Sequence, residues 1–179
     1  MKYCPNCGQI LQIRIPEGDQ LPRAVCPSCS AVHYENPRVV VGCVPEWQGR
    51  ILLCRRAIEP RHGYWTAPAG FLEIGESLHA AAIRETAEEA LARVEIGSLV
   101  SVVNVLRAAQ VHVMFRARLL ASEHGAGVES LETALFTEAE IPWGEIAFES
   151  VRFSLERYFA DRRENVERQH FHDIARPAR

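Results

Sequence analysis

Three glutamates in a short stretch of sequence have the residue type and the spacing of a metal site. Glu85, Glu88 and Glu89 are related as i, i+3 and i+4, so on a helix their carboxylates share one face. Like charges this close destabilise a helix, and Mg²⁺ relieves the repulsion because it prefers carboxylate, water and phosphate oxygens. Arg84 lies four residues before Glu88, where it can hold a carboxylate in one rotamer. The alternative is a solvated acidic face, the commoner meaning of such a string taken alone.

Two cysteine pairs near the start of the sequence form a second candidate metal site. Each pair has the form C-x-x-C, and residues 8–25 separate the pairs, which matches the spacing of zinc ribbons. Each turn presents two thiolates to one tetrahedral ion, and a hairpin returns the second turn to the first. Two disulfides in a secreted domain are the alternative, but the sequence shows no apolar signal segment. We therefore expect structural Zn²⁺ bound by Cys4, Cys7, Cys26 and Cys29.

Composition narrows the class of protein that carries these sites. The chain has 179 residues, of which 47% are apolar and 24% charged, as expected for one globular domain with a small appendage. No apolar run is long enough to cross a membrane, so we expect a cytoplasmic protein. The formal charge of −3 provides no broad basic field, which makes nucleic acid an unlikely partner.

The elements that must position these residues can be read from composition and periodicity. We expect helices over residues 77–92 and about 148–163, separated by β-branched and apolar strands. The first helix should pack through an apolar stripe opposite its glutamates, formed by Ala80, Ile83, Ala87, Ala90 and Leu91. The resulting division is a ribbon over 1–34, a mixed α/β domain over 35–163, and a polar C-terminal tail over 164–179.

The surroundings of the glutamates resemble the box of the Nudix hydrolase superfamily, G-x5-E-x7-R-E-U-x-E-E-x-G-U, in which U is a bulky apolar residue. The positions in register are Gly70, Glu76, Arg84, Glu85, Glu88 and Glu89. Thr86 and Ala92 depart from the pattern, and Leu91 replaces the glycine that normally ends the helix in a left-handed cap. Without that glycine, we expect the helix to run on by some residues.

The ribbon narrows the resemblance to zinc-ribbon Nudix proteins. Residues 101–107 lack the SQPWPFPxS signature of NADH pyrophosphatases, so the chain looks like the group that resembles ADP-ribose and FAD pyrophosphatases. The resemblance implies an α/β/α sandwich with a mixed sheet after a small zinc ribbon. It also implies a homodimeric enzyme that hydrolyses the pyrophosphate bond of a nucleoside diphosphate derivative, a small-molecule nucleotide substrate, with Mg²⁺ or Mn²⁺. The alternatives are an NADH pyrophosphatase and a non-catalytic nucleotide sensor.

The resemblance also assigns roles to individual residues. The expected ligands of the catalytic metal are the three helix glutamates, the Gly70 carbonyl and Glu129, which is also a candidate base; Glu123 and Glu132 compete for its role. Arg84 should orient Glu85, and Glu76 should support the metal through water. An aromatic or arginine platform should hold the ring of the substrate, with the candidates Arg55, Arg56, Tyr64 and Trp65.

Overall fold

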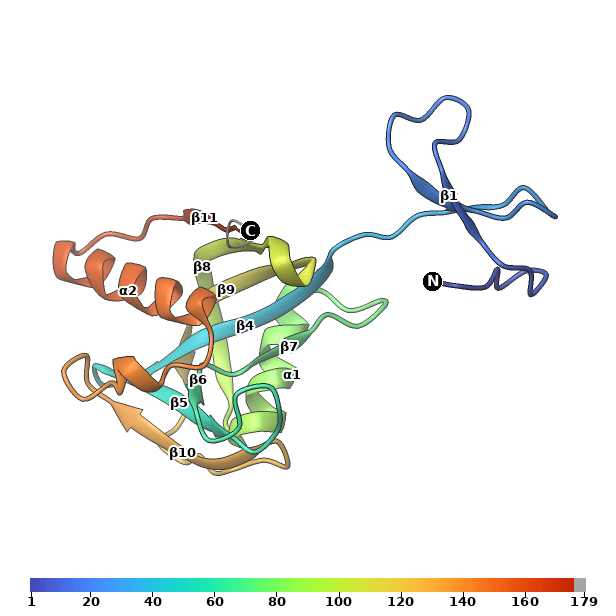
Figure 1. Cartoon of the computed structure of the whole chain (residues 1–179). Coiled ribbons are helices and arrows are strands. Elements are labelled where there is room, and N and C mark those ends of the chain that lie inside the picture. The colour runs from blue at the N-terminus through green and yellow to red at the C-terminus, as the bar shows by residue number, and fades with distance from the viewer. Residues whose placement is uncertain (176–179) are drawn as a thin grey trace. The chain divides into compact units, whose positions relative to one another are not determined.

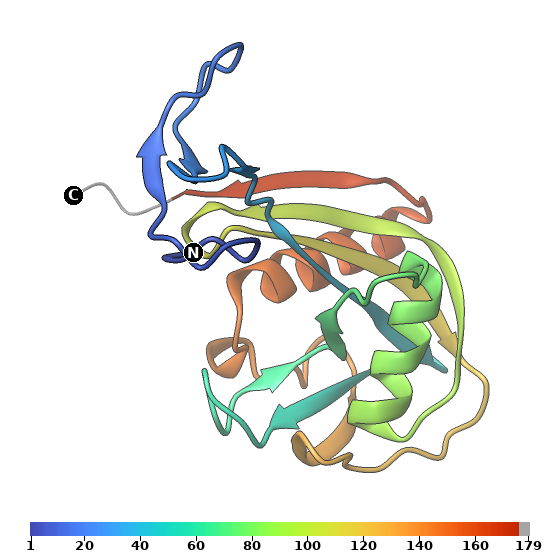
Figure 2. The ribbon, with the colours of Figure 1, turned by 90° about the vertical axis from the view of Figure 1, so that its right-hand side faces the viewer.

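The computed structural model describes residues 1–175, and its contacts separate the chain into two units, Met1–Asn36 and the residues from Pro37 on. The first unit is a ribbon of three short antiparallel strands (Figures 1 and 2). They are β1 (Gln12–Arg14), β2 (Arg23–Val25) and β3 (Val32–His33). Its buried apolar residues are few, namely Cys4, Ala24, Val25 and Cys26. Such a small core cannot stabilise the unit without a further crosslink.

The second unit is built on a mixed eight-stranded sheet. Along its main path the strand order is β10-β5-β4-β9-β8-β11, with β6 paired to β5 and β7 to β4. The strands are β4 (Arg38–Trp47), β5 (Arg50–Arg56), β6 (Trp65–Thr66), β7 (Ala69–Phe71), β8 (Val94–Val105), β9 (Gln110–Leu119), β10 (Ser130–Phe136) and β11 (His170–Ile174). The pairs β4–β9 and β8–β11 are parallel, and the other pairs are antiparallel.

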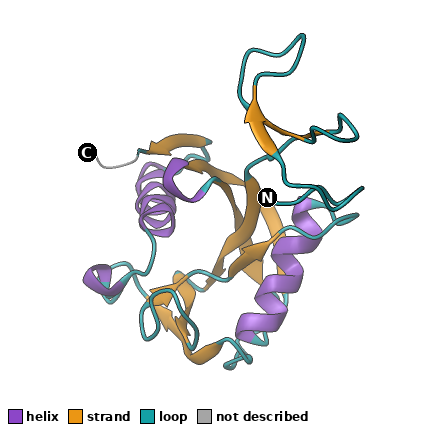
Figure 3. Ribbon diagram, turned by 45° about the vertical axis from the view of Figure 1, so that its right-hand side comes forward, coloured by secondary structure: helices purple, strands orange, loops and turns teal. Residues whose placement is uncertain are grey.

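Two α-helices cover opposite faces of this sheet (Figures 1 and 3). They are α1 (Leu78–Ala90) and α2 (Glu149–Glu164), and short 3-10 turns occur at η1 (Leu106–Ala108) and η2 (Trp143–Glu145). The arrangement confirms the predicted α/β/α sandwich. Among residues 1–175, no helix is both long and apolar enough to cross a membrane.

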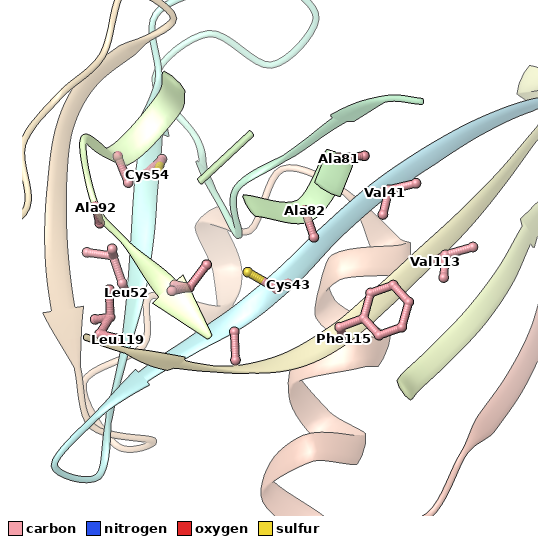
Figure 4. Packing of buried hydrophobic residues seen from close by; sticks show 13 residues of the cluster. Val41, Cys43, Leu52, Cys54, Ala81, Ala82, Ala92, Val113, Phe115 and Leu119 are labelled. Atoms are coloured by element: carbon pink, nitrogen blue, oxygen red, sulfur yellow. The ribbon is translucent and has the colours of Figure 1, made fainter. Parts of the chain in front are cut away.

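The alternation of side chains along β4 and β9 divides the core into two layers. Val41, Cys43, Val113 and Phe115 pack against α1, as Figure 4 shows. On the other face, Val44 and Met114 pack against α2 through Val151, Leu155 and Phe159. Strand side chains alternate between the two faces of a sheet, so residues 110 and 112 of β9 share the α2 side with Met114.

Helix α1 differs from the sequence expectation in the face that it buries. Ile83 and Leu91 are exposed, whereas the buried positions are Ala81, Ala82, Glu85, Thr86, Glu89 and Ala90. The predicted apolar stripe was therefore wrong for all its members except Ala90. Small residues bring the helix close to β4, and the Thr86 hydroxyl bonds to the Ala82 carbonyl at 2.7 Å, which allows burial without a bulky apolar group.

The end of α1 also differs from the expectation. The helix stops at Ala90, and Leu91 takes the left-handed conformation that glycine usually supplies, with φ 48°. Its amide donates to the Ala87 carbonyl at 3.1 Å. The prediction that the helix runs on was wrong, because neighbouring backbone can impose this conformation on a non-glycine residue at a cost of about 1–2 kcal/mol.

The C-terminal segment is more ordered than the predicted tail. Residues 170–174 form β11, which pairs in parallel with β8, and residues 176–179 lie outside the described part. Asp161 of α2 holds this segment, because its carboxylate accepts hydrogen bonds from the Arg168 amide at 3.0 Å and from Arg116 at 2.6 Å. His170 lies 3.1 Å from the same carboxylate. These polar side chains therefore belong to an ion cluster at the edge of the sheet.

Candidate active site

The four cysteines of the ribbon converge on one point. Their sulfur atoms all lie within 4.8 Å of one another, with Cys7 and Cys26 3.4 Å apart and Cys4 and Cys29 3.7 Å apart. Each turn is closed by an amide-to-carbonyl bond, from Gly8 to Cys4 at 2.8 Å and from Ser30 to Cys26 at 3.0 Å. Four thiols in this arrangement fit the tetrahedral site of structural Zn²⁺.

Backbone amides and one histidine support this thiol set. Amide groups of Cys29 and Ser28 lower the pKa of the Cys26 thiol to about 6, which favours the thiolate form that binds metal. The His33 Nε2 atom lies 3.4 Å from the Cys4 sulfur. Sequence reasoning missed His33, although its position shortly after the second C-x-x-C pair offered a signal. A group that contacts a ligand in this way orients it and tunes its charge.

The glutamates of α1 line a cleft in the second unit. Glu85 and Glu89 are buried, and Glu88 is exposed. The Glu85 carboxylate fills the space beside Gly70, where any Cβ would overlap its oxygens. Glu89 accepts a hydrogen bond from the Ala69 amide at 3.2 Å. The sequence requires glycine at position 70 because a carboxylate of the helix occupies the place of a side chain.

Burial changes the protonation of these carboxylates. It raises the pKa of Glu85, although hydrogen bonding by Arg84 opposes the shift. Burial raises the pKa of Glu89 to about 8, with the nearby negative charge of Glu85 acting in the same direction. Buried carboxylates with raised pKa values in a cleft are characteristic of functional sites.

Arg84 connects the carboxylates to one another. Its guanidinium donates to Glu85 at 2.6 Å, to Glu88 at 3.0 Å and to both oxygens of Glu76 at 3.0 Å. It also donates to the Phe71 carbonyl at 3.1 Å. The Arg84 hydrogen bond lowers the pKa of Glu76. Arg84 therefore links Glu76 to two of the α1 glutamates. Its planar guanidinium holds the side chains of Glu85 and Glu88 in fixed rotamers.

The cleft has a volume of about 1570 Å³. Of the three glutamates that follow β9 in the sequence, Glu123, Glu129 and Glu132, one lines it. Glu129 lines it together with Glu85, Glu88 and Glu89. Glu132 instead pairs with Arg55 at 2.9 Å, outside the lining. Glu123 is exposed and does not line the cleft either. Of the competing carboxylates, the structure brings Glu129 to the helix glutamates.

The four residues predicted to bind substrate are neighbours on the paired backbone of β5 and β6, but their side chains have different surroundings. Arg56 lines the cleft, with its guanidinium 5.0 Å from the ring of Phe148. Trp65 is buried against Phe136 at 4.9 Å, because it faces the α2 side of the core. The other two lie outside the cleft lining: Arg55 bonds to Glu132, and Tyr64 stacks beneath Arg61.

Sequence reasoning missed a polar relay in the part of the cleft formed by β9 and α2. His112 Nε2 lies 2.9 Å from the Gln110 side-chain oxygen, and its Nδ1 lies 2.8 Å from the Ser150 hydroxyl. All three residues line the cleft. Burial lowers the pKa of His112 to about 4, so the ring is neutral at pH 7. The available signal was a pair of polar residues at alternate positions in the otherwise apolar first half of β9.

The sequence matches the models of two known protein families. The family model described as Nudix N-terminal matches residues 2–35, and the NUDIX domain model matches residues 36–152. The chain belongs to the Nudix hydrolase superfamily. A solved NUDIX hydrolase from Nitrosomonas europaea is 49% identical, with a TM-score of 0.94, and the match covers 98% of this chain and 100% of that one. The MutT NUDIX hydrolase from Burkholderia pseudomallei is 28% identical, with a TM-score of 0.62, over 69% of this chain and 98% of that one.

Relatives with named activities match part of this Nudix chain. The mitochondrial NAD(P)H pyrophosphatase NUDT13 of Mus musculus is 34% identical over 52% of this chain and 25% of its own. The NAD-capped RNA hydrolase NudC of Chromobacterium violaceum is 39% identical over 49% of this chain and 31% of its own. The ADP-ribose pyrophosphatase of Methanocaldococcus jannaschii is 29% identical over 61% of this chain and 67% of its own. The match thus spans at most a third of the first two relatives. A relative named for an RNA substrate leaves the expected exclusion of nucleic acid without support.

Proposed function

We propose that this protein hydrolyses the pyrophosphate bond of a nucleoside diphosphate derivative, releasing a nucleoside monophosphate and a phosphorylated product. One observation carries the proposal: two buried carboxylates, Glu85 and Glu89, line a cleft of about 1570 Å³ together with Glu88 and Glu129. Burial raises the pKa of Glu89 to about 8, although the Ala69 amide and the charge of Arg56 oppose the shift. A purely structural helix gains nothing from burying such groups.

The donor set fits Mg²⁺ or Mn²⁺. Hard divalent cations take carboxylate and carbonyl oxygens and keep open positions for water and phosphate. Glu85, Glu88 and Glu89, with Glu129 and the Gly70 carbonyl, are the groups that would hold the metal ions. When bound, a divalent cation neutralises the pyrophosphate and lowers the pKa of water. This choice of ligands also explains why the raised pKa values occur at the cleft end of α1.

The chain's own residues account for the remaining steps. Arg84 keeps Glu85 and Glu88 in fixed rotamers, so the carboxylates need no reorganisation when substrate binds. Arg56 brings a positive charge to the cleft beside Phe148, where it can bind a phosphate or stack on a ring. Glu129 is exposed at the cleft, where it can accept a proton from the attacking water. The neutral relay of Gln110, His112 and Ser150 suits an uncharged polar group of the substrate.

The size of the cleft favours substrates with two halves. Ordinary small-molecule pockets have volumes of roughly 300–1,000 Å³, and this one is larger. ADP-ribose and FAD are the substrates that the sequence favours, and the ADP-ribose pyrophosphatase relative supports the first. The names of the NAD(P)H pyrophosphatase and NAD-capped RNA hydrolase relatives favour NADH or a nucleotide-capped RNA as the second candidate.

A substrate panel tests the proposal. The protein with Mg²⁺ should release AMP from at least one of ADP-ribose, FAD and NADH, or should cleave a short NAD-capped RNA to nicotinamide mononucleotide and a 5′-monophosphorylated RNA. Glu89→Gln is the matched control, because it keeps the shape of the side chain and should abolish release. Hydrolysis that persists in that variant would contradict the proposed role of Glu89 in the reaction. No hydrolysis of any of the four by the wild-type protein would contradict the proposal as a whole and favour a nucleotide sensor.

Two further expectations concern the protein in solution. We expect a homodimer, which sedimentation equilibrium of the full chain measures directly. We also expect one Zn²⁺ per chain in the ribbon, which elemental analysis of protein purified without added metal measures. A monomer at all concentrations would contradict the first expectation, and the absence of zinc would contradict the second.

A further inference from the structure

The loop between β9 and β10 is anchored to the end of α1 by two glycines. The Gly125 amide donates to the Ala90 carbonyl at 2.8 Å, and the Gly127 amide donates to the Glu89 carbonyl at 3.1 Å. The last carbonyls of a helix have no partners within the helix. The loop therefore supplies the donors that the C-terminus of the metal-binding helix requires.

The two glycines differ in how closely they approach the helix. A Cβ at residue 127 would overlap the Glu88 carbonyl oxygen, and it would lie 2.8 Å from the Glu88 carbonyl carbon and 3.2 Å from the Glu89 Cα. All of these atoms are backbone and cannot move aside. A Cβ at residue 125 would meet only the flexible side chain of Leu91, at 3.4 Å. Neither glycine has a positive φ, so close contact, rather than backbone conformation, requires glycine at position 127.

The same loop delivers Glu129. The Ser130 amide donates to the Gly127 carbonyl at 3.1 Å, and the Ala57 amide donates to the Glu129 carbonyl at 2.8 Å. The backbone of Glu129 is thus held between the anchor on α1 and the end of β5. Val128 and Glu129 are both exposed, and both line the cleft together with the helix glutamates. Its negative charge contributes to the raised pKa values of Glu85 and Glu89, although burial is the larger cause.

The geometry points to Gly127 as a positioning residue, which fixes the Glu129 carboxylate beside the carboxylates of α1 by docking the loop on the helix backbone. The Nudix box ends at Ala92, so Gly127 and Glu129 lie outside it. This inference rests on the proposed metal site, because it assigns to Gly127 the geometry of one carboxylate of that site.

A matched pair of variants tests this role. Gly127→Ala should push the loop off the helix, whereas Gly125→Ala adds the same methyl group where space exists. With Mn²⁺ alone as the probe, calorimetric titration should show at least a fivefold weaker affinity for Gly127→Ala and less than a twofold change for Gly125→Ala. On the substrate that the panel identifies, kcat should fall more than KM changes. Equal affinities in the two variants would overturn the inference.

A double variant separates positioning from a general structural effect. Glu129→Gln should itself weaken Mn²⁺ binding, and adding Gly127→Ala to it should cause less than a further twofold loss. An additional loss as large as in the wild-type background, or a Glu129→Gln variant with unchanged affinity, would contradict the role of Gly127. The titration needs no turnover, so a protein that binds Mn²⁺ as expected yet hydrolyses nothing contradicts the proposed function and leaves this inference standing.

Hydrogen exchange of the wild-type protein covers the case in which Gly127→Ala does not fold. In the metal-free protein, the amides of Gly125 and Gly127 should exchange at least tenfold more slowly than the amide of Val128. Val128 lies in the same loop, between the two glycines and β10. Exchange of the two glycine amides as fast as that of Val128 would show that the loop is not docked, and would overturn the inference.

Discussion

The ribbon and the carboxylate end of the cleft both collect metal-binding side chains, but they do so in opposite ways. The four cysteine sulfurs lie within 4.8 Å of one another. Among residues 1–175, no other group of three or more histidine, cysteine, aspartate or glutamate side chains brings its ligand atoms this close together. The glutamates remain spread, with Glu85 and Glu88 bound to the same guanidinium. The C-x-x-C turns bring the sulfur atoms together through their own backbone hydrogen bonds, whereas the carboxylates are held apart by the guanidinium of Arg84.

The difference corresponds to the two roles that metals have in proteins. A structural site is closed, because every coordination position belongs to the protein, and a catalytic site keeps positions for water and substrate. The ribbon has almost no other core, so its metal supplies folding energy. The cleft is held by the sheet, α1 and α2 without a metal. Removing each metal, or its ligands, should therefore have different consequences for folding and for activity.

The largest expected effect is on activity at Glu89. Glu89→Gln should lower kcat by about a thousand-fold or more, because an amide is a poor ligand for a hard cation and cannot carry its charge. The metal-free variant should be as stable as the wild type or slightly more stable, since the substitution removes repulsion within α1. Kinetics at saturating Mg²⁺ and thermal unfolding in EDTA measure both quantities. A variant with activity within tenfold of wild type would show that Glu89 is not a ligand.

Arg84 should show an intermediate effect. Arg84→Lys keeps the charge but loses the fork that contacts Glu76, Glu85 and Glu88 together. We expect a loss of about 10–100-fold in kcat, the range typical of groups that orient metal ligands. Arg118→Lys is a suitable control, because Arg118 is exposed, pairs with Glu95 on β8 and does not line the cleft. Equal effects of the two substitutions would indicate that charge alone matters at Arg84.

Local spacing explains why the two sites were predicted from the sequence to different degrees. The C-x-x-C turns contain their own geometry, so the sequence was enough to assign the whole thiol set. The i, i+3, i+4 glutamates were placed on one face of a helix for the same reason. The apolar stripe was wrong because the helix buries its carboxylate face, with Glu85 against Gly70 and Glu89 against the Ala69 amide.

Contacts distant in sequence account for what could not be predicted. Trp65 has the residue type of a ring platform, but the pairing of β5 with β6 turns it into the core. The relay of His112 and Ser150 joins β9 to α2, and no local sequence pattern indicates that these two residues are paired. The tail became β11 because Asp161 and the parallel edge of β8 hold it. Each case depends on packing partners that no local pattern specifies.

Removal of zinc should affect folding more than catalysis. Chelation, or the variant Cys4→Ser, should unfold residues 1–36 while the unit from residue 37 on keeps its structure, because the two units have separate cores. Activity should fall by less than about tenfold, well below the effect of Glu89→Gln. Amide spectra of the labelled full chain with and without chelator would show collapse confined to the ribbon signals. Simultaneous loss of signals from both units would show that the zinc site supports the cleft.

The smallest expected effect on activity, with a clear effect on stability, belongs to Asp161. Its side chain is 1% exposed, and it binds Arg116, the Arg168 amide and His170 far from the glutamates of α1. Asp161→Asn should lower the free energy of unfolding by about 3 kcal/mol at pH 7, because it leaves the largely buried Arg116 without its counter-charge. Activity well below the melting temperature should stay within twofold. Asp173→Asn, at an exposed residue of β11, is the control and should cost less than about 0.5 kcal/mol.

The acid dependence of stability tests the same carboxylate independently. Burial alone would raise the pKa of Asp161, but hydrogen bonds from His170 and the Arg168 amide, with the charge of Arg116, outweigh it and lower the pKa below the usual 3.8. A folded-state pKa below the unfolded value means that this carboxylate stabilises the protein above about pH 4. That contribution is lost as the pH falls further, toward the folded-state pKa. Urea unfolding between pH 2.5 and 7 should therefore show a steeper acid loss in the wild type than in Asp161→Asn. Parallel curves for the two proteins would mean that Arg116 and His170 do not depend on the charge of Asp161, and that β11 is held by its pairing with β8 alone.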